Sequence, residues 1–131
     1  MAGPLTAFTL TWPGASVAVS TGARTTVAVV LGWEGRWLVV RDDDAPPPAL
    51  GTLDVRSHGL WVSLTCEEPG VHWSVGLEAF ALAVDDPGDE RGDLVPLGLD
   101  IEWEAPGRVH GELLVGDARI ELDEAAELDV S

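Results

Sequence analysis

The strict alternation of apolar with polar or small residues between Val95 and Glu104 most limits how this chain can fold. One set of alternate positions is apolar throughout: Val95, Leu97, Leu99, Ile101 and Trp103. The positions that face the other way include Gly98, Asp100, Glu102 and Glu104. Successive side chains of a β-strand point to opposite faces of a sheet, so this period of two predicts a strand with one buried face.

Two preceding segments extend this pattern into a stretch from Leu60 to Trp103, onto which we expect the rest of the chain to pair. Leu60 to Cys66 also alternates, and the predicted strand ends before Pro69 and Gly70, which interrupt a ladder and permit a turn. His72 to Val84 is apolar on both faces, and its residues have good helix propensity, so a helix is the rival interpretation. The flanking turns and the mirrored pattern of the next segment favour a strand.

Shorter strands are predicted on both sides of this stretch, separated by turns that contain glycine or proline. We expect them over Leu5–Trp12, Ala15–Ser20, Arg24–Leu31, Arg36–Arg41, Leu50–Arg56, Arg108–Val115 and Ala118–Asp123. A hairpin that closes at Trp33-Glu34-Gly35 is the pairing most strongly indicated in the first half. About ten strands at this regular spacing predict an all-β fold, an antiparallel up-and-down barrel or sandwich.

Two acidic segments are predicted to lie outside the strands. The run from Asp42 to Pro48 is linker-like, and its three prolines predict an extended, unpaired polyproline segment. The tail, residues 124–131, is predicted to fray, with one helical turn at Glu124–Leu128 as the alternative. Neither half of the chain alone has enough strands with a buried face, so residues 1–131 are predicted to form one domain.

The composition is typical of an ordered globular protein, with 46% hydrophobic and 23% charged residues. The single cysteine, Cys66, excludes an internal disulfide, and its place on the apolar face of a predicted strand indicates a small core residue. No apolar run is long enough to span a bilayer, and the first residues lack the basic region of a signal peptide. A cytoplasmic protein with no membrane partner is therefore the default expectation.

The charge balance argues against several classes of partner and ligand. A net charge of −16 is unfavourable for binding DNA, RNA or anionic membranes, which require a basic patch, and an acidic surface more often serves solubility. The three histidines lack the spacing of metal ligands, so neither a metal nor another cofactor is expected.

Glu78 and His72 are the candidate acid–base groups. Glu78 is the one charged residue between Trp73 and Val84, and burial inside a barrel would suit it to general acid or base catalysis. The favoured interpretation is that Glu78 lies on a solvated outer face, because Ser74 and Gly76 share that face. The alternate carboxylates from Asp100 to Glu104 are likewise expected to mark a solvent face, although paired carboxylates can perform acid–base chemistry.

Aromatic residues provide the candidate ligand contacts: Trp61, Trp73, Trp103 and Phe80. Small barrels of about eight strands either fill their interior with side chains or hold one small ligand. The tryptophans are therefore predicted either to form the core or to line a cavity for a flat apolar molecule.

Three phrases between Trp37 and Leu122 carry a family resemblance: GLWVSLTCEEPGVHWSVGLEAFALAVDDP, VPLGLDIEWE and GRVHGELLVGDARIEL. They are similar to actinobacterial proteins related to the carotenoid hydratase (hydroxyneurosporene synthase) group, which have tandem lipocalin-like halves. In those relatives the last phrase continues into an Arg-Asp-His-Ser-Trp motif, whereas here Asp123 to Ser131 follows without it. The resemblance implies a lipocalin-like barrel or half-barrel, and it does not extend to hydratase activity.

These observations lead to three functional expectations. The first is a non-catalytic binding module for a small apolar molecule such as a polyketide, a terpenoid or a lipid-like compound. The second is a small barrel enzyme, an isomerase, hydratase or cyclase, that uses Glu78 or His72 as its acid–base group. The third is a structural half-barrel that pairs with a second copy, and a homodimer is expected in every case.

Overall fold

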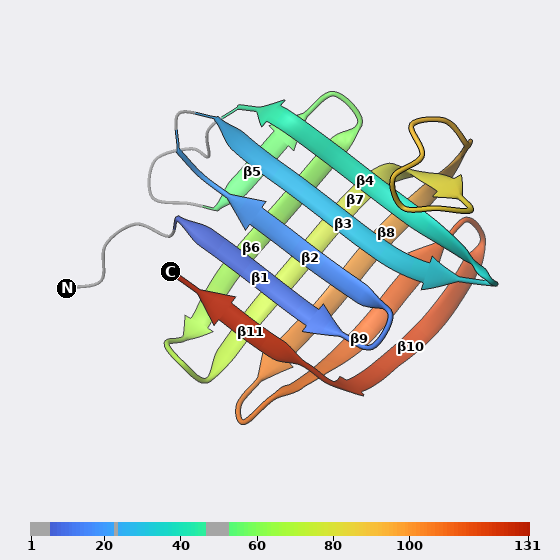
Figure 1. Ribbon diagram of the computed structural model, residues 1–131. Helices are drawn as coiled ribbons and strands as arrows, with labels where there is room; N and C mark the ends of the chain where they lie inside the picture. Colours follow the sequence, from blue (N-terminus) through green and yellow to red (C-terminus); the bar gives the residue numbers. More distant parts are fainter. Residues whose placement is uncertain (1–5, 23, 47–52) are drawn as a thin grey trace.

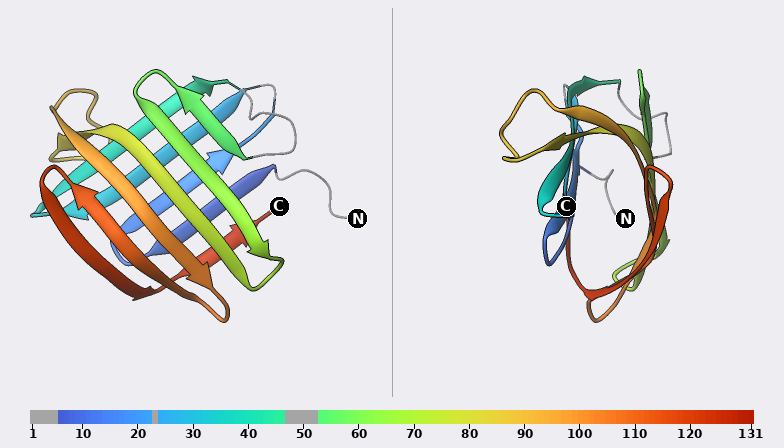
Figure 2. Two further views of the ribbon diagram at one scale, coloured as in Figure 1. Left: turned by 180° about the vertical axis from the view of Figure 1, so that it is seen from behind. Right: turned by 90° about the vertical axis from the view of Figure 1, so that its right-hand side faces the viewer.

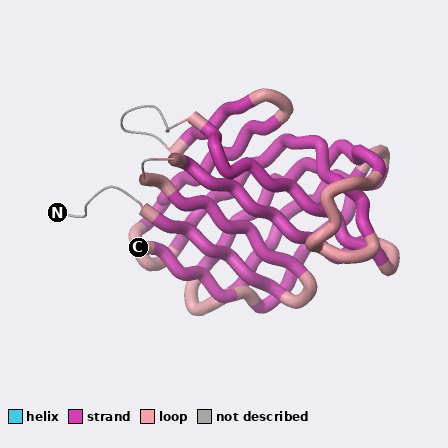
Figure 3. The backbone as a smooth tube through the Cα atoms, turned by 45° about the horizontal axis from the view of Figure 1, so that its top comes forward, coloured by secondary structure: helices cyan, strands magenta, loops and turns pink. Residues whose placement is uncertain are grey.

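Antiparallel strands account for most of the chain in the computed structural model, which describes residues 6–22, 24–46 and 53–131 (Figure 1). Its eleven strands are β1 (Ala7–Trp12), β2 (Ala15–Ser20), β3 (Thr25–Trp33), β4 (Arg36–Ala45), β5 (Asp54–Ser57), β6 (Leu60–Glu68), β7 (His72–Val84), β8 (Asp93–Glu104), β9 (Arg108–Val115), β10 (Ala118–Ala125) and β11 (Glu127–Val130). The described residues contain strands and loops only (Figure 3). The predicted all-β antiparallel fold is confirmed, with eleven strands where about ten were expected.

The strands form two layers that cross each other and join into a nearly closed, flattened barrel (Figures 1 and 2). One layer contains β11 and β1 to β4, and the other contains β5 to β10. The layers meet where β4 pairs with β7 and where the chain passes from β10 into β11. This architecture is consistent with the expected lipocalin-like barrel.

Strand β7 is shared by three neighbours. Along one edge it pairs with β8 over twelve residue pairs, from His72 to Ala83. Along the other edge its first part pairs with β6, up to Ala79, and its last residues, Leu82 to Val84, pair with β4. The sheet therefore passes from β7 directly to β4 and leaves the β5–β6 hairpin off this path, so the up-and-down order is interrupted at one place.

The core lies between the layers and consists of the apolar side chains at alternate positions of the strands. Inward-facing side chains of both layers pack into a single hydrophobic cluster. Trp73 of β7 lies across from Phe8 of β1, with ring centroids 5.4 Å apart. Every second residue of β7 from Trp73 to Ala83 is buried, which confirms the strand over His72–Val84 and excludes the rival helix.

The predicted hairpin at Trp33-Glu34-Gly35 is confirmed. Strands β3 and β4 meet through Glu34 and Gly35, whose φ angles are 49° and 77°. Positive φ at both central positions matches the right-handed twist of the two strands that a short hairpin joins.

The prediction for the acidic tail is wrong. Residues 127–130 form β11 instead of fraying or turning into a helix, and they pair with β1. Ala126 is buried at the corner between β10 and β11, where its carbonyl oxygen accepts a hydrogen bond of 3.2 Å from Trp103 Nε1. Leu128 lies opposite Leu10 and packs against the core. The pairing and this apolar contact outweigh the tendency of an acidic terminus to fray.

The linker prediction is wrong for Asp42 to Ala45, which continue β4 and end on a buried alanine. The three aspartates fit a strand because, among the described strands, this part of β4 pairs with β3 and keeps solvent-exposed positions. Pro47 and Pro48 lie outside the described residues, as do the first residues of the strand expected over Leu50–Arg56.

The prediction for Cys66 is also wrong, because the thiol is exposed. The apolar alternation of β6 leads to buried side chains only as far as Leu64. Beyond it the register with β7 shifts between Cys66 and Glu68, where the strand leaves the covered part of the sheet.

Gly111 provides a test of the β8–β9 pairing. Its φ is +139°, and a Cβ atom there would collide with the backbone carbonyl oxygen of Asp100. We expect Gly111→Ala to lower the free energy of unfolding by about 2 kcal/mol or more, measured by chemical denaturation. The control is Gly22→Ala, because the nearest described atom to its added Cβ would be the carbonyl oxygen of Arg24, at an ordinary contact distance of 3.9 Å. Equal stability of the two variants would contradict the register described for β9.

Leu128 provides a test of the pairing between β11 and β1. We expect Leu128→Ala to lower the free energy of unfolding by about 1–2 kcal/mol, because a half-buried leucine loses its apolar contacts. The neighbouring Asp129 is exposed, and Asp129→Ala should change the same quantity by less than about 0.5 kcal/mol. A frayed tail would leave both variants as stable as the parent protein.

Candidate functional site

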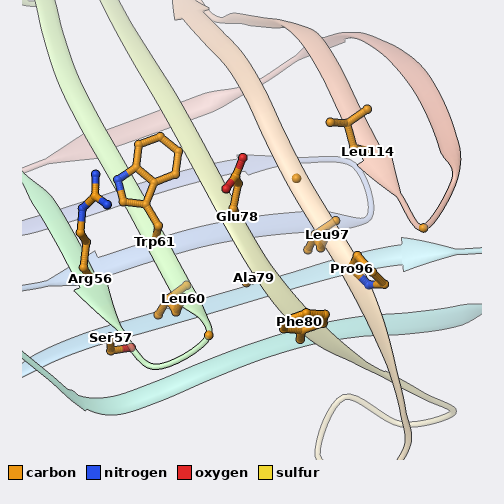
Figure 4. Close-up of a pocket in the computed structure, with 13 residues that line it drawn as sticks. Arg56, Ser57, Leu60, Trp61, Glu78, Ala79, Phe80, Pro96, Leu97 and Leu114 are labelled. Atoms are coloured by element: carbon orange, nitrogen blue, oxygen red, sulfur yellow. The ribbon is translucent and has the colours of Figure 1, made fainter.

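A groove of about 600 Å³ runs over the outer surface of the second layer (Figure 4). Its lining comes from β5 to β9 and from the turns that join them. The residues are Arg56, Ser57, Gly59, Leu60, Trp61, Glu78, Ala79, Phe80, Pro96, Leu97, Gly98, Leu114 and Gly116. Most of them are apolar or small, so the groove offers an apolar surface to solvent.

The strand register aligns one row of side chains across this surface. Trp61 of β6 pairs with Glu78 of β7, which pairs with Gly98 of β8, which in turn pairs with Leu114 of β9. Arg56 of β5 begins the row as the partner of Trp61. Because Gly98 has no side chain, the surface is hollowed at this position, between the side chains of Glu78 and Leu114.

The indole of Trp61 is held in place by three contacts. Its Nε1 donates a hydrogen bond of 2.7 Å to Oδ1 of Asp54, and the Arg56 guanidinium lies 5.8 Å from the ring centroid. The ring also lies over Gly76, where an added Cβ would approach Cη2 of Trp61 to 3.0 Å. These contacts hold the indole in one orientation on the outer face of β6.

Large apolar side chains beside this row remain exposed. Phe80 is 59% exposed and Leu114 is 38% exposed, and Pro96 is the cross-strand partner of Phe80. Leu94, two residues from Pro96 along β8, is 66% exposed. Neighbouring exposed apolar residues on a soluble domain typically mark a binding surface.

Glu78 lies exposed in the middle of the groove, between Trp61 and Leu114 (Figure 4). No other described residue forms an ion pair or hydrogen bond with its carboxylate. Arg56 is the other charged residue of the lining, and its Nε forms an ion pair with Oδ1 of Asp54 at 3.6 Å. The groove therefore presents one unpaired negative charge.

The structure divides the four predicted ligand contacts between two faces. Trp61 and Phe80 line the outer groove, whereas Trp73 and Trp103 are buried in the core at 7% and 8% exposure. The hypothesis of a single cavity lined by all three of these tryptophans is therefore wrong. The reason is the period of two, since Trp61 alternates with the buried Leu60 and Val62 and must face outward.

The two predicted acid–base residues are not brought together. Glu78 and His72 share the outer face of β7 but are six residues apart, about 20 Å along the strand. His72 Nε2 lies 2.7 Å from Oε1 of Glu102, and His110 Nε2 forms a similar contact of 2.9 Å with Glu104. The prediction that Glu78 and the carboxylates of β8 lie on the solvent face is confirmed.

The pKa shifts on this face lie away from the groove. Arg108 donates a hydrogen bond of 2.5 Å to Asp123, which lowers the pKa of that carboxyl and raises the pKa of the guanidinium. Both side chains are exposed and pair across β9 and β10, so they support the register of these strands.

Several groove residues were missed by the sequence reasoning: Arg56, Pro96, Gly98 and Leu114. A usable signal was present, because Leu114 is a large apolar residue among outward-facing positions and Gly98 is the smallest residue on the outer face of β8. What the sequence lacked was the register that makes Gly98 and Leu114 partners.

Across residues 6–22, 24–46 and 53–131, no group of three or more His, Cys, Asp or Glu side chains is arranged to hold a metal ion. The same part of the chain contains no helix that is long and apolar enough to cross a membrane.

Comparison with protein-family models, curated proteins and solved structures finds no match to this chain. The resemblance to the carotenoid hydratase group therefore stays a prediction. Because one fold can support many functions, the function has to be argued from the groove itself.

Gly76 provides a test of how Trp61 is held. We expect Gly76→Ala to displace the indole, since the added Cβ leaves too little space beneath the ring. The emission of the protein should shift to longer wavelength as Trp61 becomes more exposed, measured by fluorescence spectroscopy. The same substitution in a Trp61→Phe background should produce no shift. A shift that persists there would mean that another tryptophan has moved.

Proposed function

We propose that the protein is a non-catalytic binding module for a small apolar molecule of polyketide, terpenoid or lipid-like type, which binds in the outer groove. The observation that carries this proposal is the exposed apolar lining around a hollow floored by Gly98, with Phe80 and Leu114 open to solvent. Exposed aromatic and aliphatic groups cost solubility, and a bound apolar molecule would remove their surface from water.

The dimensions support this placement. A volume of about 600 Å³ falls within the range of typical ligand sites, roughly 300–1,000 Å³. The inward-facing side chains of both layers, including Trp73 and Trp103, already pack against one another in a single cluster. Because these side chains fill the interior, where lipocalin-like barrels hold their ligands, the outer groove is the more suitable binding site.

The arrangement of the titratable groups favours binding over acid–base catalysis. A mechanism that used Glu78 and His72 together would need both groups within hydrogen-bond distance of the same substrate. Glu78 and His72 are about 20 Å apart along β7, and His72 contacts Glu102 instead.

The homodimer expected from the sequence stays a prediction, and the exposed patch of Phe80 and Leu94 is the observation that favours it. The net charge of −16 on each copy opposes the approach of two like surfaces. Light scattering gives the mass directly, and a mass twice that of one chain would support the dimer.

The proposed site is tested by titrating the purified protein with polyenes, fatty acids and terpenoids while tryptophan fluorescence is recorded. We expect saturable quenching by at least one class, and about tenfold weaker binding in Phe80→Ser, because a large apolar contact is lost. Phe80 is exposed, so its replacement should not disturb folding.

The matched control is Val71→Ser, which removes an exposed apolar side chain from the β6–β7 turn, outside the groove. It should bind as tightly as the parent protein. Quenching that is the same in both variants would place the ligand elsewhere, and no quenching by any class would refute the binding function.

A further inference from the structure

We infer that the ligand of the groove is an amphiphilic cation, an apolar body that carries a protonated amine or quaternary ammonium group, and that Glu78 binds this group. This inference rests on the proposed binding function and adds the charge of the ligand to it.

The first argument is the position of Glu78 relative to the aromatic rings. Its cross-strand partner is Trp61, and Phe80 lies two residues along the same strand on the same face. A carboxylate beside aromatic faces is suited to a cation, since ring quadrupoles and a negative charge attract it together. Glu78 has no partner among the described residues, so a bound cation would not have to displace one.

The second argument is that the basic residues of this row are already engaged. Arg56 lies 3.6 Å from Asp54 and over the ring of Trp61. Arg119, at the other end of the row beyond Leu114, lies 3.8 Å from Glu112. An anionic ligand such as a fatty acid would have to compete with these contacts.

The third argument is the charge of the adjacent row, two residues further along each strand. The register aligns four carboxylates in it: Asp54, Asp100, Glu112 and Glu121. With Glu78, the two rows contain five carboxylates and the two guanidinium groups of Arg56 and Arg119. The rows are about 7 Å apart, which is within the screening length of about 8 Å at physiological ionic strength. The field over the groove therefore attracts cations.

The apolar side chains give the direction of the rest of the ligand. Figure 4 shows Glu78 between Trp61 and Leu114, with Phe80 and Pro96 nearer the end of β7. A cation at Glu78 would place its apolar body over Gly98, against Phe80, Pro96 and Leu114.

The inference is tested with three probes that share an eight-carbon chain: n-octylamine, n-octanol and n-octanoate. At neutral pH the amine is positive, the alcohol neutral and the carboxylate negative. Affinities are measured by calorimetry and by quenching of tryptophan fluorescence at low salt. We expect the amine to bind about three- to tenfold more tightly than the alcohol, the carboxylate to bind most weakly, and added salt to reduce the difference.

Glu78→Gln keeps the shape of the side chain and removes its charge. In this variant the ratio of the amine affinity to the alcohol affinity should fall to about one. Glu34→Gln removes the same charge from the β3–β4 turn in the other layer, and it should keep the ratio of the parent protein.

The outcomes separate this inference from the proposed function. If none of the three probes binds while a polyene, fatty acid or terpenoid still quenches the fluorescence, the binding function stands and the inference about the cation is wrong. If those ligands also fail, both are refuted. If all three bind with equal affinity, the groove is an apolar site and the inference about charge is wrong. A preference for the amine that persists in Glu78→Gln would overturn the assignment of Glu78.

Discussion

The pairing of β7 with β8 over twelve residue pairs is the constraint on which the rest of the structure depends. It fixes which side chains of both strands face inward, so that Trp73 and Trp103, which are partners in this ladder, reach the core. The other edge of β7 is divided between β6 and β4, which joins the two layers. Because a shift of one residue would exchange core and surface, this register is strongly specified.

The groove is the outer side of the same pairing. The row that contains Glu78 and Gly98 lies on the face of the sheet opposite the core, and β6 and β9 extend it with Trp61 and Leu114. A row made of an aromatic ring, a carboxylate, a glycine and an aliphatic chain has no function in packing the core. Its exposed apolar surface is unfavourable in water, and this is why binding is the function that the groove supports best.

Much of the fold could be predicted because burial imposes a period of two on strands with one covered face. The strand over His72–Val84 and the hairpin at Glu34-Gly35 follow from such local signals. The failures at Cys66 and at residues 127–130 have one cause, since local patterns do not reveal where pairing ends or which strand receives a terminus. The acidic residues of the tail predicted a solvent-exposed, frayed end, whereas pairing with β1 makes residues 127–130 a strand.

By itself the sequence determined most of the strands and the two alternating faces of each, because alternation is a local property. It favoured a solvated face for Glu78 and left Trp61 open between the core and a cavity. Only the tertiary structure decided which outward residues of five different strands share one row. The register depends on the turn lengths, on the bulges and on the packing of the core, so it is a property of the whole sheet and not of one segment. The groove exists because this register places Gly98 between Glu78 and Leu114. The alternation along each strand places the tryptophans on two different faces of the sheet.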